Sequence, residues 1–572
     1  MDFFISHNVQ KNLHKLSPNL LKTEANIIIY ITHPEIEFIS IIERQMKLNY
    51  EEKKAKGGVR DKEYHCIFIP RITSQCHDYL SKSEFEAYLT VHNLNIEVFP
   101  LDYDLMSMED TNSFKDIFID ENFSSLAKLS RIIVNFEDLF GKIKNTYIKG
   151  KYAKVLSELV EKDEEVYGVK NEEEILACIY MDRSVDYITP FLTQSIYEGL
   201  IDEHFERKFD SVKIDPKILD KPATDPKVKM DLSKNNRLYT MIKDYNFNHI
   251  GTFLSRRLQL HKEIFQKTKA ANEIKEVQQN LVYLSQSKNE SNTIHQHVGL
   301  ASYIKNLQMT PIYKLFLTIE QRLLQCEELD FLEKVFQDEI YRSPDIIKII
   351  KLFCIDNLTI GNIKNKSYDE LKRDILTVYG NQEIFLLKNL EKLKILKKKP
   401  DTKIYEILKD KLNLINEKVN VHNPNDTSYV FNAFCPISIR LIEKLLKEGW
   451  NSISDILTKI PGPTEFPKNN EPSVIKPSQN KNIMLLVFVG GITFAEIAAI
   501  RFLNSHNPRY QFIIITTSII NPKSFINQLR FDRPKEPVIK VDQDGKPEEK
   551  SDDDYDYITF RSFFNQLKQI LK

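Results

Sequence analysis

Three short apolar runs constrain the fold more than any other feature of the sequence. They are residues 175–180 (ILACIY), 483–489 (IMLLVFV) and 511–516 (QFIIIT). Runs of this length and character are typical of strands that are buried on both faces, as in a parallel sheet covered by helices. The first run needs neighbouring strands, and the runs that match it come only after residue 480. We therefore expect one sheet whose chain is interrupted by a long insertion, and the helical patterns between 235 and 450 supply it.

The first 150 residues alternate strand and helix patterns. Pro34 opens an amphipathic helix directly after an apolar run, as proline does at a first helical position. Strands that alternate with helices indicate a parallel sheet with helices on its faces. The expected strands are residues 26–32 (NIIIYIT, read as buried), 64–70 (YHCIFIP) and 94–101 (LNIEVFPL).

Charge and cysteine usage exclude several classes of protein. Lys and Arg number 80 against 81 Asp and Glu, so no global charge attracts nucleic acid or an anionic membrane. The six cysteines are scattered without zinc spacing, which fits a reducing compartment. The start lacks the pattern of a signal peptide, and the longest apolar stretch, 483–495, is too short to span a bilayer. We expect a cytoplasmic protein that reaches membranes only through partners.

Two segments are expected to be surface connections. Residues 461–482 contain five prolines, which is typical of an extended linker. Residues 542–557 are acidic and poor in aliphatic side chains, so they are expected to form a disordered loop.

The residues 487–503 are the best candidate for a nucleotide site. Gly490 and Gly491 follow a strand and precede a helix, but the phosphate-binding patterns with a third glycine or a Gly-Lys-Ser/Thr end are missing. A tight turn followed by a Thr493–Glu496 capping box explains the same residues. His295 and His297 lie two apart, which does not place them on one helix face, and we expect a packed or solvated pair. The sequence thus predicts no catalytic, cofactor-binding or metal-binding residue, and a nucleotide-binding α/β protein is the weaker alternative.

Residues 181–205 (MDRSVDYITPFLTQSIYEGLIDEHF) combine charged and helix-starting residues. Asp182, Arg183 and Asp186 are expected to form a charge-assisted network, in which the guanidinium binds two carboxylates. A structural clamp at the end of a strand is the favoured interpretation, and a catalytic Asp-Arg-Asp set is the alternative.

This segment resembles the signature of the Sec/Munc (SM) family of SNARE-regulating proteins, and its YEGLIDE portion resembles the vacuolar sorting branch. Other segments resemble that branch as well, so an SM branch of the Golgi or plasma membrane is the less favoured alternative. These segments are 97–107 (EVFPLDYDLMS), 123–129 (FSSLAKL), 244–256 (DYNFNHIGTFLSR), 428–440 (SYVFNAFCPISIR) and 489–503 (VGGITFAEIAAIRFL).

The resemblance implies a fold and a role. The fold is a three-domain arch of two parallel-sheet α/β domains and a large helical insertion. Its domains would be residues 1–150, 151–230 with 451–572, and 231–450. The role is to template and protect SNARE assembly within HOPS or CORVET tethering complexes, where vacuolar protein sorting-associated protein 16 holds the SM subunit. Such a protein lies peripherally on endosome and vacuole or lysosome membranes.

Two groups of residues are expected to make these contacts. Helix-in-groove recognition needs apolar anchors with polar neighbours, and the polar residues of 246–285 are the better contact candidates. Aromatic residues and arginine dominate interface hot spots, although strands also favour Tyr and Phe, so a core role is the alternative for the second group. The expected SNARE-binding residues are Asn248, Arg256, Arg257, Lys275 and Gln278, and those for the partner subunit are Tyr429, Phe431, Phe434 and Arg440. Asp244, Asn246 and Asn248 are expected to cap and orient the helices of the insertion, with Asp244 accepting backbone N–H bonds.

Overall fold

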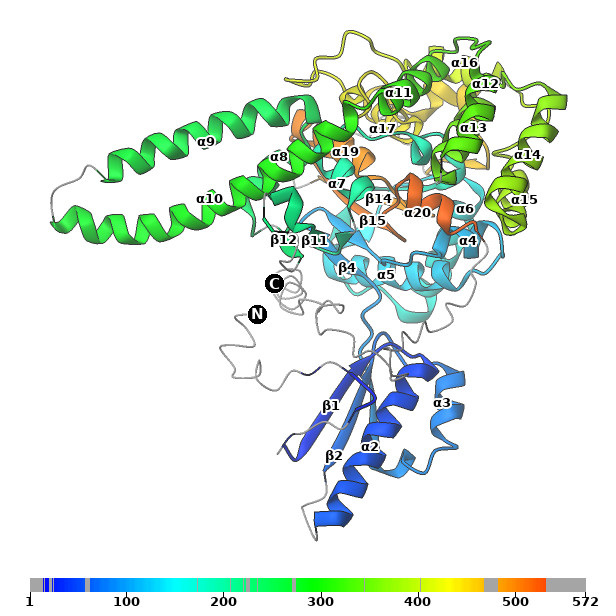
Figure 1. Cartoon of the computed structure of the whole chain (residues 1–572). Coiled ribbons are helices and arrows are strands. Elements are labelled where there is room, and N and C mark those ends of the chain that lie inside the picture. The colour runs from blue at the N-terminus through cyan, green and yellow to red at the C-terminus, as the bar shows by residue number, and fades with distance from the viewer. Residues whose placement is uncertain are drawn as a thin grey trace. The chain divides into compact units, whose positions relative to one another are not determined.

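The computed structural model describes most of the chain between residues 14 and 530 (Figure 1). The described residues form two compact units, one up to residue 100 and one from residue 101. The predicted acidic loop 542–557 lies outside the described residues, as does most of the proline-rich connection. The gaps within this range are 15, 20–22, 24, 57–61, 172, 206, 220, 223–226, 234, 270–273, 344, 402 and 468–481.

The first unit is a three-stranded parallel sheet with helices against one face. Apolar side chains from the sheet and both helices form its core, among them Ile28, Tyr30, Ile42, Cys66 and Leu80. Burial alternates along the first strand, so the prediction that 26–32 is buried holds for one face only. The elements are β1 (Ile27–Thr32), α2 (Ile36–Lys56), β2 (Glu63–Phe68), α3 (Ser74–Leu80), a 3₁₀ turn (Glu86–Tyr88) and β3 (Leu89–Asn93).

The second unit is built on a seven-stranded sheet with the order β13-β7-β9-β14-β15-β5-β4. β14 lies between β9 and β15 and is parallel to both, so the three distant apolar runs do join one sheet, as predicted. Its strands are β4 (Phe99–Asp102), β5 (Leu105–Ser107), β7 (Thr146–Lys149), β9 (Ala177–Asp182), β13 (Thr464–Glu465), β14 (Asn482–Val489) and β15 (Tyr510–Thr516).

Smaller elements surround this sheet. A two-stranded parallel pair and a three-stranded antiparallel sheet accompany it. The helices around the sheet are α4 (Ser113–Phe118), α5 (Ser124–Phe140), α6 (Lys151–Tyr167), α7 (Tyr197–His204), α19 (Phe494–His506) and α20 (Pro522–Asn527). The additional strands are β6 (Lys142–Ile143), β8 (Glu174–Ile175), β10 (Arg207–Lys208), β11 (Ser211–Ile214) and β12 (Val228–Asp231).

Between β12 and β13 the chain is helical, which confirms the expected interruption of the sheet. None of the helices among the described residues has the length and apolar character needed to cross a bilayer. The helices are α8 (Arg237–Ile242), α9 (Phe247–Lys269), α10 (Ile274–Gln308), α11 (Pro311–Leu324), α12 (Leu332–Arg342), α13 (Ile346–Thr359), α14 (Asn365–Tyr379), α15 (Ile384–Lys392), α16 (Lys403–Lys411), α17 (Ile437–Lys447) and α18 (Ser454–Leu457).

The limits of the three expected domains stay a prediction. Strands β4, β5 and β7, which that division assigned to residues 1–150, lie in the same sheet as β9 and β14.

Candidate functional site

The Gly490–Gly491 turn is filled by the protein's own groups. Both glycines have positive φ, and a Cβ on Gly490 would lie 2.8 Å from the Phe118 ring. Thr493 and Glu496 form the predicted capping box at the start of α19. The Ala495 amide donates to Gln194 Oε1 at 2.8 Å. The side-chain oxygens of Glu496 and Gln194 therefore already accept hydrogen bonds from the backbone N–H groups that a bound phosphate would need.

Arg183 forms a buried ion pair, but its main partner is not the one predicted. Its guanidinium donates to both oxygens of Glu496, at 2.9 and 3.0 Å, while Asp186 Oδ2 lies 3.9 Å away. Asp182 instead accepts from the amides of Tyr152 and Ser184. Burial alone would raise the pKa of the Glu496 carboxyl, but Arg183 outweighs it and holds that pKa below its ordinary value. The segment is thus a clamp between β9 and α19.

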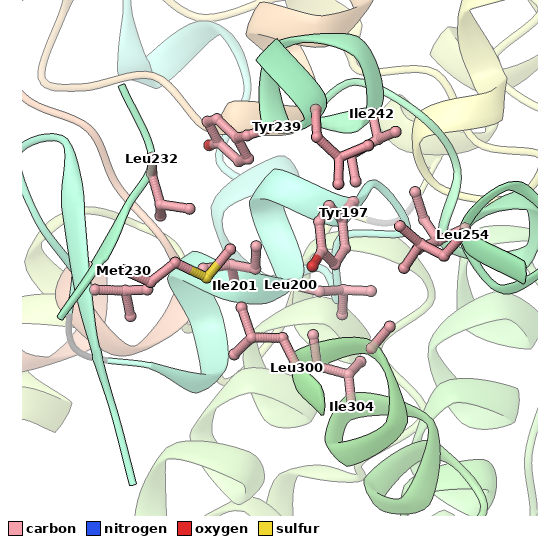
Figure 2. Close-up of a cluster of buried hydrophobic side chains, with 14 of the residues drawn as sticks. Tyr197, Leu200, Ile201, Met230, Leu232, Tyr239, Ile242, Leu254, Leu300 and Ile304 are labelled. Atoms are coloured by element: carbon pink, nitrogen blue, oxygen red, sulfur yellow. The ribbon is translucent and has the colours of Figure 1, made fainter. Parts of the chain in front are cut away.

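Helices α9 and α10 run side by side and project from the rest of the second unit (Figure 1). At their base, side chains from α7, β12, α8, α9 and α10 meet in one buried cluster (Figure 2). Leu254 enters it from α9, and Leu300 and Ile304 enter from α10. These residues anchor the hairpin at its base.

The predicted SNARE-binding residues lie on this hairpin. Asn248, Arg256 and Arg257 are exposed on α9. Lys275 and Gln278 belong to α10, in a stretch whose side chains lie outside the described part. The first three can meet a partner without rearrangement of the core, and their role in binding stays a prediction.

The predicted partner-binding residues are buried. Tyr429 is only 3% exposed, and the side chains of Phe431 and Phe434 are buried as well. Arg440 is also buried and donates to both carboxylate oxygens of Asp426, at 2.9 and 2.7 Å. This burial supports the alternative core role for the aromatic residues, whereas their role in partner binding stays a prediction.

The two predicted groups meet at the base of α9. Asn246 Nδ2 donates to the Tyr429 carbonyl and to Asn432 Oδ1, each at 2.8 Å, and its Oδ1 accepts from the Asn248 amide. The Tyr429 hydroxyl donates to the Asp244 carbonyl at 3.1 Å. The predicted capping is therefore confirmed for Asn246, which directly precedes the helix. The Asp244 carboxylate, which was expected to accept backbone N–H groups, instead accepts from Arg501.

The Asp244 carboxylate belongs to a charged cluster that the sequence reading missed. Arg501 on α19 donates to Asp244 at 3.0 Å and to Asp102 and Asp104 at 2.9 Å. Burial would raise the pKa of Asp102, but Arg501 and Lys243 lower it below its ordinary value. The cluster ties the start of α9 to the central sheet. The only feature in the sequence that could have indicated this cluster is Asp-x-Asp at 102–104. Its partner, Arg501, lies far away in the sequence.

The remaining chemical candidates are structural. His297 is buried and lies 2.9 Å from the Tyr197 hydroxyl, while His295 is exposed, so the expected packed or solvated character is confirmed. Among the described residues no group of three or more His, Cys, Asp or Glu side chains could hold a metal ion. Cys178 and Cys354 are buried thiols.

Comparison with known proteins decides the family. The sequence model of the Sec1 family matches residues 1–528. The chain belongs to the Sec1 family. Proteins of this Sec1/SM family regulate SNARE proteins and are not enzymes.

Curated relatives show which members of the Sec1 family the chain is similar to. The chain is 29% identical to vacuolar protein sorting-associated protein 33A of Rattus norvegicus, over 91% of this chain and 90% of the relative. It is 28% identical to the vacuolar protein-sorting-associated protein 33 homologue of Arabidopsis thaliana, over 90% of this chain and 88% of the relative. These matches fit the branch expected from the sequence.

Solved structures of the Sec1 family share the fold. The Unc18–syntaxin 1 complex of Monosiga brevicollis has a TM-score of 0.59 at 13% identity and covers 89% of each chain. Sly1p in complex with an N-terminal peptide of Sed5p has a TM-score of 0.56 at 15% identity, over 90% and 86%. The expected SM fold is therefore confirmed.

Proposed function

We propose that this Sec1 family protein acts as the SM subunit of a HOPS- or CORVET-type tethering complex. It would template SNARE assembly during fusion with endosomes and the vacuole or lysosome. The similarity to vacuolar protein sorting-associated protein 33 over nine-tenths of the chain supports this branch. The observation that carries the SNARE-binding site is the exposed, basic surface of α9 on a firmly anchored base.

The geometry suits a template. An unpaired SNARE motif is ordered only when bound, so holding two motifs in register lowers the entropic barrier to their association. A template must not move relative to the rest of the protein. The α9–α10 hairpin meets this need at its base, where Asn246 and the hydrophobic cluster fix it. Asn248, Arg256 and Arg257 then face a partner as polar and basic contacts.

A charge reversal tests this site. Arg256→Glu with Arg257→Glu keeps helix propensity nearly unchanged while it reverses the charge of the surface. We expect about tenfold weaker binding of a syntaxin-type SNARE domain, since each charge at an interface rim contributes roughly 0.5–1 kcal/mol. The matched control is Lys162→Glu with Lys366→Glu, two exposed lysines on α6 and α14 that change the net charge equally. The affinity for the SNARE domain is measured by titration with each purified full-length variant. If both double variants bind it equally well, the SNARE-binding site is not on α9.

Anchoring by vacuolar protein sorting-associated protein 16 is the second part of the proposal. We place its contact around residues 428–440, as the family resemblance implies. Because Tyr429, Phe431 and Phe434 are buried, they would shape this surface from beneath rather than contact the partner directly. Co-purification of the two full-length proteins tests it: Arg440→Ala should weaken the complex, and an unchanged yield places the contact elsewhere.

A further inference from the structure

One face of the β1–β2–β3 sheet is uncovered in the described part of the first unit. Parallel sheets normally carry helices on both faces, because both faces are apolar. Here α2 and α3 pack on the face that holds Ile28 and Tyr30. On the opposite face, Ile27, Ile29 and Ile31 are 54%, 58% and 47% exposed. Three half-exposed isoleucines in one strand are an unusual apolar surface for an isolated protein.

The exposed residues form one continuous patch. Ile31 pairs with Ile67 of β2 and Ile29 pairs with His65, so these side chains share the outer face. The His65 ring stacks on His92 of β3, with the ring centroids 5.3 Å apart. The face is therefore apolar along β1 and becomes polar toward β3, which matches a partner with one apolar and one polar side.

The chain itself offers such a partner beyond the described residues. The family match ends at residue 528, and the sequence continues to 572. Residues 558–571 (ITFRSFFNQLKQIL) place apolar side chains three or four positions apart, which is the pattern of an amphipathic helix. The apolar positions are Ile558, Phe560, Phe563, Phe564, Leu567, Ile570 and Leu571.

We propose that residues 558–571 form a helix that covers the outer face of the β1–β2–β3 sheet. A helix over these residues is about 21 Å long, and the six-residue strand β1 is about 20 Å long, so the two apolar surfaces match in length. The preceding residues 531–557 can extend to roughly 90 Å, so they act as a tether without restricting the docking. A second copy of the chain or another protein could cover the same face, and the test separates these occupants.

Thiol labelling of the full-length chain measures the coverage directly. Five of the six native cysteines are buried and Cys326 is half-buried, so an introduced exposed cysteine is distinguishable by mass spectrometry. Ile29→Cys places a thiol at the centre of the patch. We expect it to react at least about tenfold more slowly than the control Val166→Cys, whose position on α6 is 74% exposed. Adding Phe563→Asp and Phe564→Asp should release the helix and bring the two rates together.

A peptide of residues 556–572 provides the second measurement. The full-length Phe563→Asp/Phe564→Asp protein should bind it, whereas the unchanged protein should bind about 100-fold more weakly, because the tethered segment competes at roughly millimolar effective concentration. Fast labelling of Ile29→Cys in the intact chain overturns the proposal. Protection that survives the two phenylalanine changes also overturns it. In that case, protection that grows with protein concentration, together with a dimer by light scattering, identifies a second copy, and constant protection identifies another segment.

Discussion

Tyr429 separates the two interpretations of residues 428–440, because an interface residue and a core residue respond differently to a charge. Tyr429 is 3% exposed, and the centroid of its ring lies 5.6 Å from that of the Phe502 ring. Its hydroxyl donates to the Asp244 carbonyl, and its own carbonyl accepts from Asn246. Tyr429→Asp would empty this space and place a carboxylate next to Asp244.

The structure sets the expected magnitude. Loss of a buried aromatic ring costs about 3–5 kcal/mol, and an unpaired buried charge adds several more. The sum is comparable to the whole stability of an ordinary domain, about 5–15 kcal/mol. Tyr429→Phe keeps the ring and removes only the hydroxyl group, so it should cost about 1–1.5 kcal/mol. We therefore expect Tyr429→Asp to prevent folding of the second unit and Tyr429→Phe to leave it folded.

Circular dichroism and thermal unfolding of the two purified variants decide the question, with co-purification of the partner subunit as a parallel readout. A Tyr429→Asp protein that melts like the unchanged chain but loses the partner would refute the core interpretation and place the side chain at the interface. A variant that fails to fold shows that lost partner binding says nothing about direct contact.

Three further predictions concern Glu496, two glycines and His297. Glu496→Ala should lower the free energy of unfolding by about 3–5 kcal/mol, because it leaves the Arg183 guanidinium buried without its main partner; a loss below 1 kcal/mol in urea titration would contradict this. Gly490→Ala should destabilise the protein by about 1–3 kcal/mol, because Gly490 has a positive φ and the added Cβ would lie against Phe118. Gly251 lies in open space on α9, so Gly251→Ala should stabilise the protein by about 0.5–1 kcal/mol in the same titration. Burial lowers the pKa of His297 to about 3, so only the unfolded chain gains this proton as the pH falls through about 6.5. Stability should therefore drop by about 1.4 kcal/mol between pH 7.5 and 5.5, and His297→Gln should lack that part of the pH dependence.

The sequence predicts the central sheet well because its strands are buried on both faces. Residues 483–489 are apolar throughout, and residues 484–489 are all buried in the strand, so the apolar run reflects the burial directly. The capping box at Thr493 was predictable for a different reason: its two partners lie only three residues apart in the sequence. In contrast, β3 (LTVHN) was missed because only Leu89 of its five residues is buried, which leaves little apolar signal.

Long-range polar contacts were not predictable from the residues alone. Arg183 has acidic neighbours on both sides in sequence. The Asp182 carboxylate nevertheless binds a backbone amide of α6, and the Arg183 guanidinium binds Glu496. Arg501 binds Asp102 and Asp104, which lie far from it in the sequence. No pattern around Arg501 indicates that pairing. Each choice depends on how the strands bring distant chain segments together, and no spacing rule contains that information.

The Arg501 cluster explains how the hairpin can be both a projecting arm and a fixed one. Arg501 lies on α19, which directly follows the central strand β14, and it binds Asp244 just before α9 begins. Rotation of the hairpin at its base would separate this pair and leave a buried guanidinium with fewer partners, which is strongly unfavourable. Asn246 adds a second restraint through Tyr429 and Asn432. The orientation of α9 is therefore set by the sheet, so a SNARE helix bound along its basic surface would be held in a defined direction relative to the whole second unit.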